Sequence, residues 1–275
     1  MLLALDVGNT QIFAGVFRDD EVVAKFRGTS CNATADEFGT FFKNAIRENG
    51  IDPKDITEVA ICSVVPDLLY TLRHMAVKYF GLEPFLLQGG VKTGLNIKYK
   101  NPLEVGADRI ANSIAATAMF PNRNLVIVDL GTATTFCAVT ANKEYLGGLI
   151  LPGLRISMEA LATRTAKLPR VEIMKPPELV GKSTVDSIQS GLYYSNLLAI
   201  KGIAAKIKEE YFGGDALILG TGGFSKLFEG AEVFDKVLAD LVLTGTAMAA
   251  RMNKGRLMGI APDAAPATGH EKVRK

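Results

Sequence analysis

Two segments of the chain repeat one another, and this repeat limits the possible folds more than any other feature. Leu2–Val16 reads LLALDVGNTQIFAGV and Leu125–Val139 reads LVIVDLGTATTFCAV, at a constant offset of 123 residues. Both copies have an apolar strand, an Asp-x-Gly turn and a second apolar strand, a combination that chance seldom supplies twice. The repeat predicts an internal duplication, with two domains of similar topology facing each other. The matched positions include Asp6 with Asp129, Gly8 with Gly131, and Phe13 with Phe136.

Hydrophobic periodicity predicts alternating strands and helices, and therefore an α/β layer architecture with mixed sheets. Thr34 and Glu37 form a capping-box pattern at the start of the first helix, which Gly50 ends. The strands expected are Leu2–Val7, Gln11–Phe17, Val22–Arg27, Glu58–Val65, Glu83–Leu87 and Asp215–Leu219, and the further helices are Asp67 to about Phe80, about Thr184 to Tyr211, and about Asp235 to Asn253.

Bulk properties exclude several classes of protein. The chain has 275 residues and a net charge of +2, so it has no charge excess that indicates a nucleic acid or an anionic membrane as partner. No run approaches the roughly 18 to 20 apolar residues of a membrane helix. The three cysteines, Cys31, Cys62 and Cys137, lie far apart, which is typical of reduced thiols in a cytoplasmic protein and argues against a Cys/His zinc site.

The turn Asp6 to Thr10 joins the first two strands and has residues suited to phosphate. Gly8 allows a positive φ and a close approach of the backbone to a ligand. The turn can then direct its amides and the Asn9 and Thr10 side chains at phosphate oxygens, while Asp6 can hold Mg²⁺ directly or through water. The same residues also suit an ordinary tight turn, so one copy alone leaves both interpretations open.

The second copy, Asp129 to Thr134, favours the phosphate interpretation, because two such turns can hold the β- and γ-phosphates of a nucleotide from opposite sides of a cleft. A later Gly-rich turn, Gly220–Gly223, follows a strand and is placed to meet an adenine or ribose. In this order the three segments resemble the phosphate-1, phosphate-2 and adenosine segments of the acetate kinase, sugar kinase, Hsp70 and actin superfamily. The resemblance spans most of the chain up to about Gly255.

This resemblance implies two duplicated ribonuclease-H-like (actin-like ATPase) domains with mixed sheets flanked by helices. We expect the first domain over residues 1–115 and the second over residues 116–255. Residues 256–275 are rich in Ala, Pro and charge, and we expect a mobile tail there.

A second constellation lies between the two copies: Tyr99-Lys100-Asn101-Pro102, then Gly106-Ala107-Asp108-Arg109. By itself the Asp-Arg pair is more consistent with an ion pair at a helix start. In the functional interpretation Asp108 accepts a proton from an attacking alcohol, and Arg109 or nearby backbone holds an anionic substrate. Together with DVGNT, DLGTATTF and GGLILPG (Gly147–Gly153), these segments resemble the type III pantothenate kinases.

That family resemblance implies ATP-dependent phosphorylation of pantothenate to 4′-phosphopantothenate, the first step of coenzyme A biosynthesis. It also implies Mg²⁺, a monovalent cation (K⁺ or NH₄⁺), and a homodimer with the substrate pocket near the subunit interface. Asp108 becomes the proton acceptor, Asp129 the K⁺ ligand and Asp6 a Mg²⁺ ligand; Thr184 has a second interpretation as a helix N-cap. The implied ATP contacts are Asp6, Val7, Gly8, Asn9, Thr10, Gln11, Ile12, Phe13 and Thr132, and the implied pantothenate contacts are Tyr99, Gly106, Ala107, Asp108, Arg109 and Thr184.

Two other functions stay open beside the kinase. A phosphohydrolase of the same superfold would use water as the acceptor, but Asp108 and Arg109 near a tyrosine favour an organic, anionic acceptor. A non-catalytic regulator that kept the fold would be expected to lose Asp6, Asp108 or Asp129, and all three are present. The chain also lacks a basic stripe that would indicate DNA binding. The kinase is therefore the favoured hypothesis.

Overall fold

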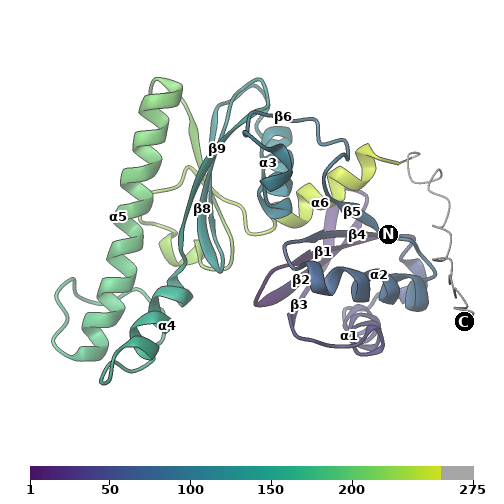
Figure 1. Ribbon diagram of the computed structural model, residues 1–275, viewed down its shortest axis with the longest axis horizontal. Coiled ribbons are helices and arrows are strands. Elements are labelled where there is room, and N and C mark those ends of the chain that lie inside the picture. The colour runs from purple at the N-terminus through teal and green to yellow at the C-terminus, as the bar shows by residue number, and fades with distance from the viewer. Residues whose placement is uncertain (255–275) are drawn as a thin grey trace, which may run out of the picture.

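The computed structural model describes residues 1–254, which are built around two mixed β-sheets (Figure 1). The first sheet contains β1 (Leu2–Val7), β2 (Gln11–Arg18), β3 (Glu21–Thr29), β4 (Glu58–Ser63) and β5 (Phe85–Leu87). The second contains β6 (Asn96–Ile97), β7 (Leu125–Leu130), β8 (Ala133–Val139), β9 (Glu144–Pro152), β10 (Leu217–Thr221) and β11 (Lys236–Val237).

The two sheets share one topology. The first has the strand order β3-β2-β1-β4-β5, and the second has the order β9-β8-β7-β10-β11 when read from β9, with β6 added beside β9. In the first sheet β1 and β2 form an antiparallel hairpin, and β4 and β5 run parallel to β1. In the second sheet β7 and β8 form the corresponding hairpin, and β10 and β11 run parallel to β7. The predicted duplication and the predicted mixed sheets are therefore confirmed.

Six α-helices of residues 1–254 form layers around the sheets: α1 (Ala35–Glu48), α2 (Pro66–Phe80), α3 (Ala107–Met119), α4 (Leu154–Arg164), α5 (Thr184–Phe212) and α6 (Leu241–Met252). Helices α1 and α2 cover the outer face of the first sheet, and α4 and α5 cover the outer face of the second. Helices α3 and α6 lie between the sheets and join their inner faces in one apolar cluster (Figure 1).

Side-chain alternation along β1 and β7 aims one aspartate from each strand at this middle layer. Leu2 and Ala4 pack on α3 and α6, whereas Leu3 and Leu5 pack on α1 and α2. Because successive side chains of a strand point to opposite faces, Asp6 takes the next inward position after Ala4. Residues 125 and 127 point inward in the same way, so Asp129 of β7 takes the corresponding place. Both aspartates thus lie on facing sheet surfaces, where the apolar layer ends.

Several local predictions meet the structure directly. The Thr34–Glu37 capping box is present, with the Glu37 amide donating to Thr34 Oγ1 at 3.2 Å. The last helix is shorter than predicted: it begins at Leu241, because Lys236 and Val237 pair with β10 as strand β11. Strands β6 and β9 and helix α4 were not predicted.

The division of the chain at residues 115 and 116 stays a prediction. β6, from the first half of the chain, pairs in the second sheet, and α6, from the second half, packs on the first sheet. The expected tail, residues 256–275, lies outside the described residues. Within residues 1–254 no helix combines the length and the apolar character that a membrane crossing requires.

Helices α3 and α6 approach so closely that only glycine fits at their crossing. A Cβ atom on Gly245 would lie 1.8 Å from the backbone oxygen of Ala111. Backbone cannot give way as a flexible side chain does, so the two helices would have to separate. In contrast, a Cβ atom on Gly202 of α5 would meet no atom within 4 Å.

We therefore expect the same substitution to have opposite effects at these two helical glycines. Gly245→Ala should lower the free energy of unfolding by about 3 kcal/mol, because it overpacks a rigid contact. Gly202→Ala should raise it by about 0.5–1 kcal/mol, because alanine is the better helix former. Urea denaturation of the three proteins measures both changes, and a neutral or stabilising Gly245→Ala would contradict the close packing of α3 on α6.

Candidate active site

A cleft of about 400 Å³ opens between the two repeated turns. It collects residues from β1, β2 and β3 of the first sheet, from β7, β8 and β10 of the second, and from the first turns of α3 and α4. The predicted site residues that line it are Asp6, Gly8, Asn9, Thr10, Gln11, Phe13, Asp108, Asp129 and Thr132. Val7 and Ile12 were also predicted to contact ATP, but their side chains are buried on the other face of the sheet, against α1 and α2.

The first turn is held by backbone and by one serine. The Gly8 amide donates to the Gln11 carbonyl at 3.1 Å, and Ser30 Oγ donates to the Gly8 carbonyl at 2.5 Å. The expected positive φ of Gly8 is wrong, because Gly8 is absent from the left-handed residues of the structure. Its missing side chain instead leaves room for Gln11, whose carbonyl oxygen would lie 3.3 Å from a Cβ atom.

The glycine that does need a left-handed backbone belongs to the third turn. Gly222 follows β10, has a φ of +87°, and faces the cleft. A Cβ atom there would lie 2.3 Å from Asp129 Oδ1. The Gly-rich turn therefore reaches the cleft as predicted, and its glycine lets the backbone pack directly on an aspartate of the site.

The two repeated turns differ by one residue. Asp6 lies opposite Phe13 in the first hairpin, whereas Asp129 lies opposite Thr135 in the second. The predicted superposition is thus correct for β1 and β7 but wrong by one residue for β2 and β8, because the second turn is shorter. A one-residue shift reverses the face to which every side chain points. Thr135 therefore lines the cleft, and Phe136 is fully buried on the opposite face.

The two turns meet across the cleft. Thr10 Oγ1 and Thr132 Oγ1 lie 3.3 Å apart, at a distance where either hydroxyl can donate to the other. This contact joins residues of different sheets, so the tips of the two hairpins form one continuous polar rim. A bound phosphate chain at this rim would meet both turns together.

Three carboxylates converge on the cleft, and burial makes each of them harder to ionise. Burial raises the pKa of Asp6 well above its usual value, and the charges of Asp108 and Asp129 raise it further. Burial and the charge of Asp108 raise the pKa of Asp129 to about 6. Burial also raises the pKa of Asp108, against the opposing effects of the Arg109 amide and guanidinium. The cleft is therefore short of positive charge, and a cation entering it would be bound favourably.

The residues present suit hard cations. Among residues 1–254 no three or more His, Cys, Asp or Glu side chains are grouped to enclose a metal ion. Mg²⁺ needs no such group, because it is commonly held by one or two carboxylates together with substrate phosphates. Asn112, which is 2% exposed, donates its Nδ2 to Asp129 Oδ2 at 2.8 Å, and its buried Oδ1 has no partner within the described chain. That free oxygen beside a carboxylate suits a cation such as K⁺ at Asp129.

Asp108 and Arg109 are neighbours in sequence but point to different places. Asp108 faces the cleft from the first turn of α3, and the missing side chain of Gly106 leaves room for it. The Arg109 side chain is 5% exposed and turns under β8, where its Nη2 donates to the Phe136 carbonyl at 3.2 Å and its Nε to Cys137 Sγ at 3.3 Å. The predicted ion pair between these two side chains is not present among the described salt bridges.

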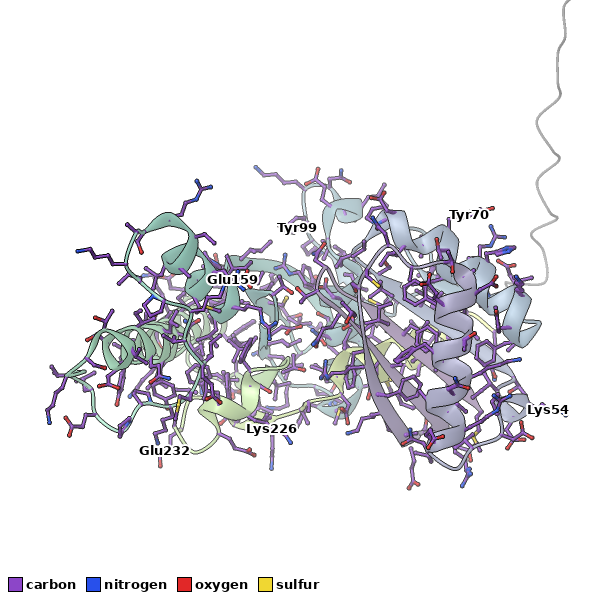
Figure 2. All side chains as sticks on the ribbon, turned by 90° about the horizontal axis from the view of Figure 1, so that it is seen from below. Lys54, Tyr70, Tyr99, Glu159, Lys226 and Glu232 are labelled. Atoms are coloured by element: carbon purple, nitrogen blue, oxygen red, sulfur yellow. The ribbon has the colours of Figure 1, made fainter. Side chains whose placement is uncertain are left out.

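Tyr99 lies near Arg109 and does not line the cleft. It lies where the two halves of the molecule meet (Figure 2), with its ring 6.3 Å from that of Tyr145. Arg109 in turn lies 5.8 Å from the Tyr145 ring. The predicted substrate contacts at Tyr99 and Arg109 thus form a second group with Tyr145, and neither of them lines the cleft.

Thr184 is not brought to this site within one chain. It is the first residue of α5 and lies in a larger hollow of about 850 Å³ between α4 and α5, which shares no lining residue with the cleft. The N-cap of α5 is Ser183, whose side chain accepts from the Asp186 amide. We place the chemistry in the smaller cleft, because the carboxylates and both repeated turns are there.

Comparison with known proteins decides the family. The model of the type III pantothenate kinase family matches residues 2–206. The type III pantothenate kinase of Legionella pneumophila strain Corby is 57% identical over 254 residues, which cover 92% of this chain and 99% of the relative. That of Elusimicrobium minutum is 48% identical over 256 residues, which cover 92% and 99%.

The chain belongs to the type III pantothenate kinases. The family predicted from the sequence is thereby confirmed, together with its class as an ATP-dependent kinase of coenzyme A biosynthesis.

Solved structures confirm the fold class of this family member. A conserved putative Baf family transcriptional activator from Campylobacter jejuni has a TM-score of 0.57 at 20% identity, covering 91% of this chain and 98% of that one. A putative 2-dehydro-3-deoxygalactonokinase from Sinorhizobium meliloti has a TM-score of 0.55 at 12% identity, covering 93% and 100%. At such identities the likeness concerns the fold alone.

Sequence reasoning missed several residues of the cleft in this pantothenate kinase. Arg27 of β3 and Arg155 of α4 line it, as do Thr135 of β8 and Thr221 of β10. Asn112 bonds to Asp129 from α3, and its position one turn after Asp108 on the same helix was a usable signal. No sequence signal indicated the two arginines. The place of Arg27 depends on the register of β3, and that of Arg155 depends on helix α4, which was not predicted.

The pKa of Asp129 leads to a prediction about stability in the metal-free protein. Since folding raises this pKa from about 4 to about 6, the folded state binds the extra proton and stability falls as the pH rises through 6. From pH 5 to pH 7.5 this group should lower the free energy of unfolding by on the order of 1 kcal/mol. Asp129→Asn should remove it, giving a higher Tm at pH 7.5 and a weaker decline with pH than wild type.

The control is Asp55→Asn, which changes an exposed aspartate on the surface and should leave the pH profile of Tm as in wild type. Thermal melts in chelator at several pH values measure all three proteins. A profile for Asp129→Asn that parallels wild type would contradict the raised pKa.

Proposed function

We propose that this chain transfers the γ-phosphoryl group of ATP to the primary hydroxyl of pantothenate, giving 4′-phosphopantothenate and ADP. The observation that carries this proposal is the placement of Asp108. Its carboxylate enters the cleft between the two repeated turns, beside Asp6 and Asp129. A base at that point can meet an alcohol that approaches the end of a nucleotide bound along the turns.

ATP would bind along the polar rim formed by the two hairpins. The amides of the first turn and the hydroxyls of Thr10 and Thr132 are placed to donate to phosphate oxygens. Gly222 and Gly223 line the cleft beside the second turn, and we propose that a ribose or adenine lies against their backbone. Bound Mg²⁺ supplies charge neutralisation and orientation of the phosphates, and Asp6 is the residue proposed to hold it.

Asp108 would receive the proton of the attacking hydroxyl. As the oxygen of pantothenate forms a bond to the γ-phosphorus, the bond from that phosphorus to the bridging oxygen of ADP breaks, and the proton moves to the Asp108 carboxylate. Burial raises the pKa of Asp108, which makes its carboxylate a stronger base than that of an exposed aspartate. Tyr99 and Arg109, grouped behind it, are proposed to contact the anionic acceptor.

A monovalent cation is proposed at Asp129. Its carboxylate and the free Oδ1 of Asn112 are oxygen ligands of the kind that K⁺ or NH₄⁺ accepts. A cation there would offset part of the repulsion among the three aspartates and the incoming phosphates.

A homodimer completes the proposal. Thr184 lies in a hollow separate from the cleft, so it can meet pantothenate only from a second copy of the chain. Large apolar side chains are exposed beside that hollow, including Val180 at 75% and Leu198 at 65%, as an interface between copies requires. We propose a cytosolic enzyme, a setting supported by the three free cysteines.

The central experiment measures ADP release by purified protein with ATP, Mg²⁺, K⁺ and pantothenate. Release should require pantothenate, and mass spectrometry should detect phosphopantothenate. In Asp108→Asn, which keeps the shape but not the basicity, kcat should fall about 10²-fold, towards the lower end for loss of a general base because phosphoryl transfer is loose.

Asp67→Asn is the matched control, because Asp67 is also in the first turn of a helix but is exposed. It should keep wild-type kcat. Pantothenate-independent ADP release by wild type would instead support a hydrolase, and a folded Asp108→Asn with normal kcat would exclude Asp108 as the base.

The cation proposal predicts a response to K⁺ at fixed Mg²⁺. Activity should be low in Na⁺ and rise several-fold when K⁺ or NH₄⁺ replaces it at constant ionic strength. Asp129→Ala should abolish this response because the carboxylate ligand is lost. A wild-type rate that is the same in Na⁺ and K⁺ would overturn the cation site and leave the kinase proposal standing.

A further inference from the structure

Three residues of adjacent strands form a row on the inner face of the first sheet. Asp6 of β1 is paired with Phe13 of β2, and Phe13 is paired with Arg27 of β3. Residues paired across strands point to the same face. All three line the cleft, so the row places an arginine on the same surface as the aspartate at the end of β1.

The Arg27 guanidinium is held by an aromatic ring. Its Cζ lies 3.9 Å from the centroid of the Phe13 ring, a cation–π contact that fixes the plane of the guanidinium. Asp6 is within electrostatic reach, since burial and the other two aspartates raise the pKa of Asp6 while Arg27 acts to lower it. The positive charge is therefore oriented and lies beside the acidic centre of the cleft.

The donors of Arg27 are nevertheless uncommitted. Among residues 1–254 the guanidinium makes no ion pair within 4 Å, and none of its N–H groups has a hydrogen-bond partner. A ring face attracts a cation but accepts none of its hydrogen bonds in the guanidinium plane. Arginine offers five N–H donors in a planar fork that matches phosphate oxygens, and here that fork is available to a ligand.

The second copy of the repeat has no counterpart to this cation. The equivalent row runs from Asp129 through Thr135 to Ile150, because β7, β8 and β9 take the places of β1, β2 and β3. Threonine replaces the ring, and isoleucine, 66% exposed, replaces the arginine. The two halves keep the same turn and aspartate but differ in charge at this position, so the asymmetry belongs to the function of the first half.

We propose that Arg27 binds the terminal phosphate of the nucleoside triphosphate, with Phe13 as the platform that orients it. The terminal phosphate is favoured over the carboxylate of the acceptor, because Arg27 shares its row with Asp6 and lines the cleft beside the first turn, whereas Tyr99 and Arg109 do not line the cleft. Arg27 takes no part in proton transfer. Its charge stabilises the equatorial oxygens of the phosphoryl group as that group moves. This inference rests on the proposed function only for the assignment of the cleft to ATP.

The experiment compares binding of ADP with binding of an ATP analogue that has an imide at the β,γ bridge, both with Mg²⁺, by calorimetry. In Arg27→Gln the affinity for the analogue should fall about 10- to 100-fold, the usual effect of losing hydrogen bonds to a charged group. The affinity for ADP should change less than about 3-fold, because ADP lacks the contacted phosphate. In turnover assays kcat should fall about 10²-fold, with the KM for pantothenate unchanged.

Arg18→Gln is the matched control, because Arg18 ends β2 on the same hairpin but is exposed and does not line the cleft. It should bind both nucleotides as wild type does. If Arg27→Gln does not fold, as judged by circular dichroism, the same comparison of nucleotide affinities is made with Arg27→Lys. Lysine keeps the charge without the fork of donors, so its affinity for the ATP analogue should fall less, and its affinity for ADP should not change.

The proposal is overturned by a folded Arg27 variant that binds the ATP analogue normally, or that loses ADP and analogue equally. A raised KM for pantothenate with unchanged nucleotide binding would assign Arg27 to the acceptor instead. Because nucleotide binding is measured without pantothenate, failure of the pantothenate reaction in wild type would refute the proposed function and leave this test intact.

Discussion

Mutual repulsion among Asp6, Asp108 and Asp129 is the constraint around which the rest of this structure is arranged. Each carboxylate is held in the cleft by an element whose apolar residues are buried in the middle layer, so packing on both sheets opposes the repulsion. Burial, and then the charge of Asp108, raise the pKa of Asp129, as expected for a carboxylate held in such a place. A site with three acids is incomplete by itself, and bound metal ions would supply the positive charge that both the carboxylates and the incoming phosphates require.

Much of the fold follows from patterns that can be seen in the sequence. The repeat around Asp6 and Asp129 predicts two matching sheets, because the same turn between the same apolar strands requires the same hairpin. Alternation within Leu2–Val7 then sends Asp6 inward with Leu2 and Ala4. Thr34 caps the start of α1, because its side chain accepts a hydrogen bond from the nearby Glu37 amide. These features depend on contacts near in sequence or on strict periodicity, which is why they can be predicted.

The remaining features depend on register, which the sequence pattern does not reveal. The turn at Asp19 and Asp20 would pair Phe13 with Phe26 if both strands were regular. A bulge between Val16 and Phe17 shifts the pairing by one residue and brings Arg27 opposite Phe13 instead. No glycine or proline marks the bulge, so periodicity alone sends Arg27 to the wrong face. Similarly, because the second turn is shorter, Thr135 rather than Phe136 lies opposite Asp129. The separation of Thr184 from the cleft depends on packing between distant helices.

The glycine contact between α3 and α6 also has a mechanical meaning. Helix α6 is tied to the β2–β3 hairpin near both ends, by Lys25 with Asp240 and by Arg251 with Asp20. At the crossing, Gly245 leaves no clearance for the two helices to slide past one another. Sliding of α3 along α6 is therefore blocked by backbone, and the two sheets are kept in the relative position that brings Thr10 and Thr132 together.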